Sequence, residues 1–484
     1  MPLTLLEVKQ NKKYRNMLIG FLAGSILLAF TPLAQGLMYL IPATGFMMGW
    51  YMKRRSRVHY ITLVLWLFFL APMVRRMIEY HLQAQTAAMV IATPILACVA
   101  GMPTLRRLQI ILSSVRLRSV VLIVTTMVYA AVVGFLTHSP FGMVQELVTW
   151  IGPLAFALYL FDQREYMEEI LSLVRNNFLF GILAMGLYGV YQYLVLAPWD
   201  AYWMENSSLS TIGSPERLQV RVFSTMNAPQ TLADFLIFGL LLCVSSTRKL
   251  RYTAMPFALM TLALTSSRSA WVGGAAGMLF AVFSLPAKRR IQIAFALFGC
   301  IALMGVLTQI PEVDELLTAR LSSFTNLKED SSVNQRLASQ QQAITMFLAK
   351  PFGNGFGGSG ASEGGSGPSY GVATIQGVYQ NDNGIEQVTL TYGWAGSLVF
   401  IFGFAAAVTA ALRVSGTTDL MALKAGLISL VVQVPTMGIF PSATGMLLWT
   451  SIMVSLASQE LQATAPLYSG TTLQFRPIEA QEAS

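Results

Sequence analysis

The sequence predicts an all-α polytopic membrane protein, a bundle of about 12 to 14 transmembrane helices with one large extracytoplasmic loop containing short helices. Hydrophobic residues make up 54% of the 484 residues and charged residues 11%. Uncharged apolar runs of about 20 residues, the length that crosses a bilayer, recur along the whole chain. Small basic groups separate many of these runs, as the positive-inside rule predicts for cytoplasmic loops.

The first apolar stretch, residues 17 to 52, carries no charged side chain and is longer than a single span. It contains Pro32 and Pro42, and basic groups flank it at residues 9 to 15 and 53 to 57. A hairpin of two spans places both basic groups on the cytoplasmic side. The stretch is longer than the apolar region of a signal peptide, so we expect no cleavable signal.

Both termini are expected to be cytoplasmic, because the later basic groups then also lie inside. Further spans are predicted at residues 59 to 75, 86 to 104, 118 to 137, 143 to 161, 178 to 198, 229 to 246, 252 to 267, 269 to 286, 291 to 310, 387 to 412, 420 to 437 and 441 to 458. The lower total of about 12 applies if the first stretch and the last pair are partly re-entrant.

One domain is expected, a single bundle over residues 1–458, followed by a polar, disordered cytoplasmic tail at 459–484. Its extracytoplasmic loops lie at about 311–386 and about 199–228. Residues 352 to 370 of the larger loop are rich in Gly and Ser, a composition typical of flexible linkers. The length of that loop and its helix-like stretches at 313 to 325 and 334 to 349 favour a functional segment.

The composition and the absence of common motifs exclude several functions. Cys98, Cys243 and Cys300 all lie in apolar runs and are odd in number, so we expect no disulfide framework and no metal site. No HExxH, CxxC, P-loop or GxSxG motif occurs, which argues against zinc chemistry, ATP hydrolysis and serine hydrolysis. No cofactor is expected. The net charge of +9 is scattered, so it indicates membrane lipid rather than nucleic acid as a partner.

Basic residues on the predicted outer side carry the functional argument, because the positive-inside rule disfavours them there. Of the 32 Lys and Arg residues, nine fall on that side: Arg75, Arg76, Arg217, Arg221, Arg268, Arg320, Lys328, Arg336 and Lys350. Arg75 and Arg76 end an apolar run, so they are either snorkelling anchors or part of an anion site.

Arg221 and Arg268 are harder to explain as anchors. Arg268 lies between two apolar runs with almost no loop, Arg221 lies just before a span, and Arg217 comes one helical turn earlier. The planar guanidinium matches phosphate oxygens bidentately, so converging arginines would form a pyrophosphate site. The alternative is a structural ion pair with an internal acid such as Asp234.

Asp382 lies where the chain re-enters the membrane after the large loop. A carboxylate near apolar surface can act as a general base. Asp382 and Asn383 are also good N-caps, and the two roles are compatible. Glu386, one turn later, is a second candidate, whereas His59, His81 and His138 are less suitable.

Four short motifs in this order resemble those of the O-antigen ligase/polymerase family. They are Arg221 with STMNAPQ, SSRSAW at 266 to 271, Arg336 through Pro351 with GNGFGG, and DNGIEQVTLTYGWAG at 382 to 396. The resemblance implies an undecaprenyl-pyrophosphate-linked sugar donor, inverting transfer on the extracytoplasmic side and no metal. It also implies that Arg221 and Arg268 hold the lipid pyrophosphate, and it matches Arg336 to a loop arginine. Asp382 stands where the ligases of the family have a histidine taken as the base, and it is similar to many polymerases.

We therefore expect a polymerase of bacterial exopolysaccharide, capsule or O-antigen in the inner membrane, a glycosyltransferase whose partners include other polysaccharide assembly proteins. Asp382, Arg268 and Arg221 are the expected catalytic residues, and the expected substrate-binding residues are Arg75, Arg76, Arg217, Arg336, Asn383 and Glu386. One alternative is a ligase that transfers finished glycan to lipid A or protein. A flippase or secondary transporter is the other, although the charges collect at the outer boundary and the two halves show no repeat.

Overall fold

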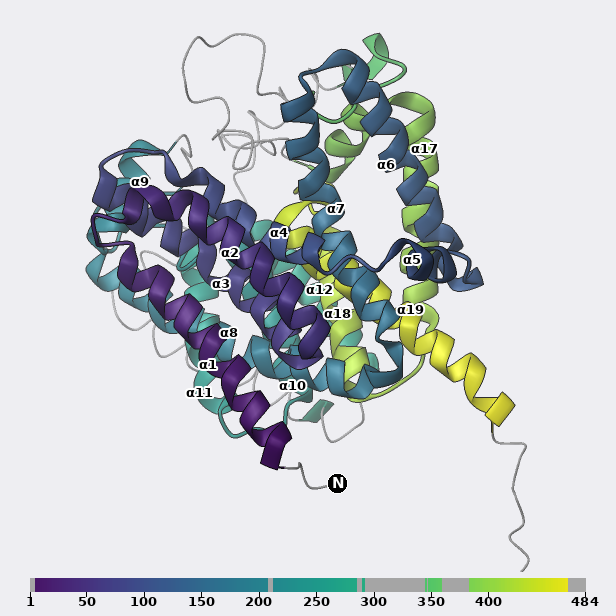
Figure 1. Cartoon of the computed structure of the whole chain (residues 1–484), viewed down its shortest axis with the longest axis horizontal. Coiled ribbons are helices and arrows are strands. Elements are labelled where there is room, and N and C mark those ends of the chain that lie inside the picture. The colour runs from purple at the N-terminus through teal and green to yellow at the C-terminus, as the bar shows by residue number, and fades with distance from the viewer. Residues whose placement is uncertain are drawn as a thin grey trace, which may run out of the picture.

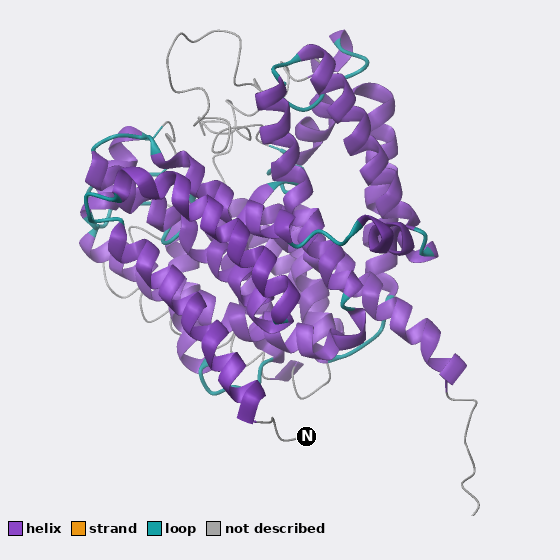
Figure 2. Ribbon diagram, viewed as in Figure 1, coloured by secondary structure: helices purple, strands orange, loops and turns teal. Residues whose placement is uncertain are grey.

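The structure, a computed structural model, describes residues 5–207, 212–284, 290–291, 344–345, 347–358 and 383–468. Within these ranges the elements are α-helices and short 3-10 helices, and the β pairing is limited to an isolated bridge between Gly213 and Val220 (Figure 2). The prediction of an all-α protein is confirmed for the part of the chain that is described.

The helices follow the apolar runs of the sequence closely. They are α1 (Leu5–Leu28), α2 (Ala34–Arg55), α3 (Arg57–Leu82), η1 (Ala87–Ile91), α4 (Ala92–Ala100), α5 (Leu105–Leu112), η2 (Val115–Leu117), α6 (Arg118–Thr137), α7 (Pro140–Asp162), η3 (Arg164–Tyr166), α8 (Met167–Val195), α9 (Pro198–Asn206), α10 (Pro229–Ser245), α11 (Arg251–Thr265), α12 (Arg268–Ser284), α17 (Gly384–Arg413), α18 (Thr418–Gln433) and α19 (Ser442–Tyr468). The first apolar stretch divides into α1 and α2 at a break that contains Pro32, as expected for a hairpin. The predicted span at 291 to 310 lies almost entirely outside the described residues.

Five helical stretches in the described part are long and apolar enough to cross a membrane: Arg57–Leu82, Val115–Thr137, Pro140–Asp162, Arg164–Val195 and Gly384–Arg413. A sixth is possible if the pair Ala87–Ala100 and Leu105–Leu112, which is bent by 77°, forms one broken span. Some of the remaining helices are shorter than a span; α11 has 15 residues, so it rises only about 23 Å against a hydrocarbon core of about 30 Å. The described part therefore contains five or six candidate spans, and the expected total of about 12 to 14 stays a prediction.

Helix α10 lies in the middle of the bundle, and every residue from Leu232 to Ser245 is buried. It packs against α8, α11, α12 and α18 (Figure 1). Small residues allow α12 to approach α18 closely: a Cβ on Gly273 would lie 2.5 Å from the carbonyl of Ser429, and one on Gly277 2.6 Å from that of Ala425. Such close helix contacts are the usual means of association in a bilayer, where apolar burial alone gives little preference for protein over lipid.

The Gly-rich segment at 351–358 is packed against α6, α7 and α17, in contrast to a flexible linker. The Phe356 side chain is fully buried, and its backbone N–H donates to the Ala130 carbonyl at 3.0 Å. Gly355 has a φ of +67° and lies against Gly134, where a Cβ would clash with backbone. Glycine is therefore used here for close approach and backbone conformation. The rest of the predicted linker, from residue 359 onward, lies outside the described residues.

The two ends of the bundle carry different segments. Figure 1 shows α9 and the α6–α7 turn on the side opposite the beginning of α1, as expected if α9 belongs to an outer loop. Helix α19 continues to Tyr468, so a helix covers the first residues of the predicted tail, and residues 469–484 lie outside the described part. Cys98 and Cys243 are buried and free, while Cys300 is also outside it.

Candidate functional site

The side chain of Arg221 lies at the junction between α11 and α12, and Arg268 is the first residue of α12. The backbone N–H of Arg221 donates to the Ile212 carbonyl at 2.9 Å. Its side chain reaches the end of α11, where Nε donates to the Thr265 carbonyl at 3.2 Å and Nη2 to the Ser266 carbonyl at 3.3 Å. Ser266 adopts a left-handed conformation with φ 52°, and α12 begins at Arg268 two residues later. The structure thus brings the Arg221 side chain to the helix junction that contains Arg268, 47 positions later in the sequence.

Hydrogen bonds extend from this junction to the neighbouring helix ends. Gln230, at the start of α10, accepts from Ser269 at 3.1 Å and from Ser267. Its Nε2 donates to Oε1 of Gln433, the last residue of α18, at 2.9 Å. We call the set Arg221, Gln230, Ser267, Arg268, Ser269 and Gln433 the polar junction. It joins the start of α10, the end of α11, the start of α12 and the end of α18, helices that pack against one another through α10.

The N-terminus of α17 adjoins the polar junction. The backbone N–H of Gly384 donates to the carbonyl of Val434, the residue after Gln433, at 2.7 Å. Asn383 caps the helix: its Oδ1 accepts from the Glu386 N–H at 2.7 Å, and its Nδ2 donates to the Glu386 carboxylate at 2.7 Å. The first bond is a side-chain N-cap, and the second joins the side chains of the cap residue and of Glu386 three positions later. The N-cap prediction for Asn383 is confirmed, and a substrate contact by Asn383 or Glu386 stays a prediction.

Asp382, the predicted general base, lies outside the described residues. Its position in the chain, directly before the Asn383 cap, joins it to the helix end that contacts the polar junction. Arg336, Arg320 and Lys328 also lie outside the described residues. Arg217 is on an exposed turn, and Lys350 donates to the Asn354 side chain within the Gly-rich segment at 2.8 Å.

Arg75 and Arg76 differ from snorkelling anchors, because both side chains are fully buried. Arg75 pairs with Glu79 one helical turn later, Nε to carboxylate at 2.8 Å, and its guanidinium lies 4.8 Å from the ring centre of Trp203. Arg76 pairs with Asp200 of α9 at 3.0 Å. These are the structural ion pairs that the sequence left open as an alternative. Direct substrate binding by Arg75 or Arg76 is not tested, but their carboxylate partners argue against it.

Asp200 is held by groups from two helices. It accepts hydrogen bonds from Tyr188 and Gln192 of α8, each at 2.8 Å, in addition to its pair with Arg76. Burial raises the pKa of the Asp200 carboxyl, while Arg76 and the two hydrogen bonds oppose that rise.

Several site residues were missed by sequence reasoning: Asp200, Gln192, Gln230 and Gln433. The signal available for three of them was a glutamine inside or beside an apolar run, where an amide requires a partner. For Arg75 the signal was stronger, because Glu79 stands at the spacing that allows a pair on one helix face. Side chains that could hold a metal ion, three or more His, Cys, Asp or Glu together, do not occur within the described ranges.

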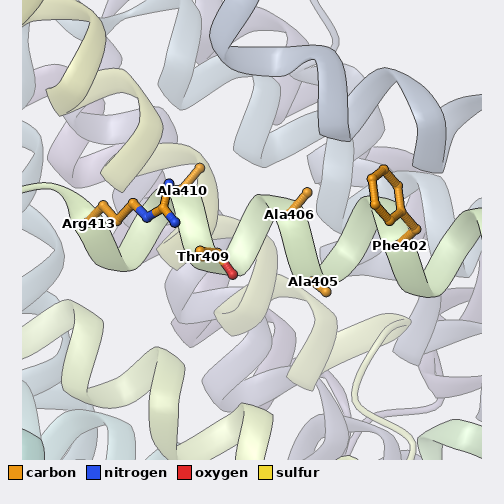
Figure 3. Close-up of a pocket in the computed structure, with 6 residues that line it drawn as sticks. All are labelled: Phe402, Ala405, Ala406, Thr409, Ala410 and Arg413. Atoms are coloured by element: carbon orange, nitrogen blue, oxygen red, sulfur yellow. The ribbon is translucent and has the colours of Figure 1, made fainter.

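A surface groove of about 350 Å³ lies on α17, lined by Phe402, Ala405, Ala406, Thr409, Ala410 and Arg413 (Figure 3). The close-up shows Phe402 and Arg413 at opposite ends of the lined stretch. The residues that line the groove begin at Phe402, more than about four helical turns beyond Glu386 along α17. The groove is therefore separate from the polar junction and from the cap of α17.

Comparison with known proteins gives a match to the part of the chain that runs from α11 into α17. Residues 253–401 match a protein-family model described as O-Antigen ligase. The matched region contains Ser267, Arg268 and Ser269 and extends through the start of α17. It thereby confirms the family resemblance suggested by the motifs. No curated protein matches the chain.

Proposed function

We propose that this chain polymerises a bacterial surface polysaccharide, a function supported by the match of residues 253–401 to a family model described as O-Antigen ligase. In this proposal a growing glycan is transferred from undecaprenyl pyrophosphate to the non-reducing end of a lipid-linked repeat unit. The reaction takes place on the extracytoplasmic side of the inner membrane, and both termini are cytoplasmic. The product is an exopolysaccharide, capsule or O-antigen.

The observation that carries the proposal is the position of the Arg221 side chain at the junction between α11 and α12, close in sequence to Arg268 and beside the N-terminus of α17. Hydrogen bonds to the Thr265 and Ser266 carbonyls orient the Arg221 guanidinium at this junction. In the proposal the Arg268 guanidinium joins it there, because two such groups suit a pyrophosphate, whose oxygens accept bidentate hydrogen bonds and carry concentrated negative charge. Preorganised cations stabilise the charge that develops on such a leaving group.

The chemistry then needs one base and one anion site. The acceptor hydroxyl attacks the anomeric carbon of the donor, a new C–O bond forms with inversion, and the bond to the pyrophosphate oxygen breaks. Asp382 takes the hydroxyl proton, and Arg221 and Arg268 hold the departing lipid pyrophosphate. Arg336 and the large loop contribute to binding of the two glycans. The donor is already activated, which is consistent with a reaction that draws on no nucleotide.

The polymerase is favoured over a ligase by the aspartate at position 382, where the family resemblance associates a histidine with ligases. Both enzymes would use the same donor and the same arginines, so the acceptor separates them. The matching family model, described as O-Antigen ligase, supports their common chemistry.

The test uses proteoliposomes of the full-length protein supplied on the outer side with purified lipid-linked repeat unit. Wild-type protein should convert single repeats into long chains, whereas Asp382→Ala and Arg268→Ala should leave single repeats. Arg55→Ala is the matched control, because it removes an exposed arginine at the end of α2, outside the polar junction and outside the expected site residues.

Long chains formed by Asp382→Ala at the wild-type rate would refute the proposed base. Wild-type protein that only transfers preformed glycan to lipid A or protein would identify a ligase. Wild-type protein that only moves repeat units across the bilayer would identify a flippase.

A further inference from the structure

The chain around Arg221 crosses the interior of the bundle without helical structure. Val222, Phe223 and Ser224 are fully buried, and Ser224 adopts a left-handed φ of 48°. A buried non-helical segment must find partners for its backbone N–H and C=O groups outside its own chain. The side chains that supply those partners determine where the segment lies.

Gln192 of α8 supplies two of the partners. Its Oε1 accepts from the backbone N–H of Phe223 at 3.0 Å and from that of Ser224 at 2.8 Å. Its Nε2 donates to the Asp200 carboxylate at 2.8 Å, and the whole side chain is buried. The bond to Asp200 fixes the amide orientation, so that the oxygen faces the Phe223–Ser224 backbone.

Arg76 holds the next peptide of the segment. Its Nη2 donates to the Ser224 carbonyl, and its guanidinium lies 4.7 Å from the ring centre of Phe223. Its ion pair with Asp200 joins it to Gln192, so Arg76, Asp200 and Gln192 form one network against the two residues. We call these three side chains the buried clamp.

The buried clamp and the end of α11 bind adjacent residues of the segment 221–224. The Val222 N–H donates to the Leu264 carbonyl at 3.1 Å. The side chain of Arg221 donates to the next two carbonyls, those of Thr265 and Ser266. The clamp acts on Phe223 and Ser224, immediately beyond Val222. A shift of Phe223 or Ser224 therefore moves the backbone from which the Arg221 side chain extends.

We propose that Gln192, supported by Arg76 and Asp200, is a positioning residue that sets Arg221 for binding of the donor pyrophosphate. This inference rests on the proposed function of Arg221. The clamp residues act through the backbone and do not themselves touch the donor. Displacements of about 1 Å are sufficient to reduce catalysis strongly, so a buried amide remote from the reacting atoms can control the rate.

A double-mutant cycle tests the proposal on full-length protein in proteoliposomes. Gln192→Leu should slow chain growth at saturating donor by about tenfold and weaken binding of inorganic pyrophosphate to the detergent-solubilised protein. Arg221→Gln should cause the larger loss. The double variant should be no slower than Arg221→Gln, because Gln192 acts through Arg221. Wild-type kinetics in Gln192→Leu, or losses that multiply in the double variant, would overturn the positioning role.

The matched control is Asn177→Leu on the same helix. Asn177 is also a buried amide, accepting from Trp66 Nε1 at 3.0 Å and donating to the Leu173 carbonyl at 2.9 Å, but it lies away from the 221–224 segment. Asn177→Leu should lower thermal stability about as much as Gln192→Leu while keeping wild-type kinetics. An equal kinetic loss in both variants would show general destabilisation and overturn the proposal.

A swap variant covers the case in which Gln192→Leu does not fold. Gln192→Glu keeps an acceptor for the two backbone N–H groups but places a carboxylate against Asp200. Combining it with Asp200→Asn restores one donor and one acceptor and leaves a single negative charge beside Arg76. Chain growth in the double swap should exceed that of Gln192→Glu, and no recovery would count against the clamp.

The proposed function and the inference fail in different ways. Chain growth at the wild-type rate in Arg221→Gln would remove the role of Arg221 and, with it, both claims. An inactive Arg221→Gln together with a fully active Gln192→Leu would retain the function and reject only the positioning role.

Discussion

The arginine pair of α3 and Arg221 of the polar junction all stand beside apolar runs in the sequence, and the structure gives them different contacts. Arg75 and Arg76 are buried and paired with Glu79 and Asp200, so each cation is matched by a carboxylate. Two bonds of Arg221 go to backbone carbonyls at the end of α11, and these bonds orient its guanidinium. The sequence position of an arginine at a membrane boundary is therefore not enough to assign it to an anion site. The groups that its side chain contacts in the folded protein must also be known.

The largest effect should come from removing one member of a buried pair. Arg76→Leu leaves the Asp200 carboxylate buried beside Tyr188 and Gln192, so we expect a loss of about 3 to 5 kcal/mol in the free energy of unfolding. Unfolding in detergent, followed by circular dichroism, measures it. A loss below about 1 kcal/mol would contradict the structural role assigned to this pair.

Substitutions of the arginines in the polar junction should lower activity more than stability. Arg221→Gln and Arg268→Gln should each slow chain growth by about 100-fold to 1,000-fold, because each removes a preorganised donor to the leaving pyrophosphate. Rates of chain growth from lipid-linked repeat units provide the measurement, and the unfolding transition should change far less than in Arg76→Leu. Loss of folded protein in place of activity would make these arginines structural, like those of α3.

A smaller effect is expected when a buried pair is removed completely. The double change Arg75→Leu with Glu79→Leu deletes both charges, so no unpaired ion remains, and the free energy of unfolding should change by less than about 1.5 kcal/mol. Either single change should be clearly worse than the double change. Comparison of the three unfolding curves decides this, and an activity loss in the double variant would indicate that Arg75 contacts substrate.

The smallest effect belongs to Arg217, whose side chain lies on an exposed turn. Arg217→Ala should alter the free energy of unfolding by less than about 0.5 kcal/mol. Donor KM and the maximal rate should stay within about twofold of wild type. A raised donor KM with an unchanged maximal rate would instead assign Arg217 a role in ground-state donor binding, as the sequence predicted.

The sequence predicted the local structure well because that structure depends on neighbouring residues. Apolar runs located the helices, Pro32 marked the break between α1 and α2, and Asn383 marked the start of α17. The Gly-rich segment was predicted as linker-like because composition reports backbone freedom, whereas its packing depends on Gly134 of a distant helix and on the pocket that takes Phe356.

Part of the candidate site could also be predicted. Arg221 and Arg268 stand at helix boundaries where a charge is costly, and the family motifs surround them, so the sequence identified both. Gln192 could not be ranked above other polar residues of apolar helices, because its importance depends on hydrogen bonds to Phe223, Ser224 and Asp200. The partner of Arg76 is 124 positions away at Asp200, beyond any local pattern.

Composition and periodicity alone predict a helical membrane protein with arginines on its outer side. They do so because the free energy of placing a charge in hydrocarbon depends on residue type and on position along an apolar run. Which groups each arginine contacts is a property of the folded chain. Burial with a carboxylate, as for Arg76, or orientation by carbonyls, as for Arg221, depends on which distant helix ends are packed together. That packing assigns Arg75 and Arg76 to the interior and brings Arg221 to the helix junction that begins with Arg268.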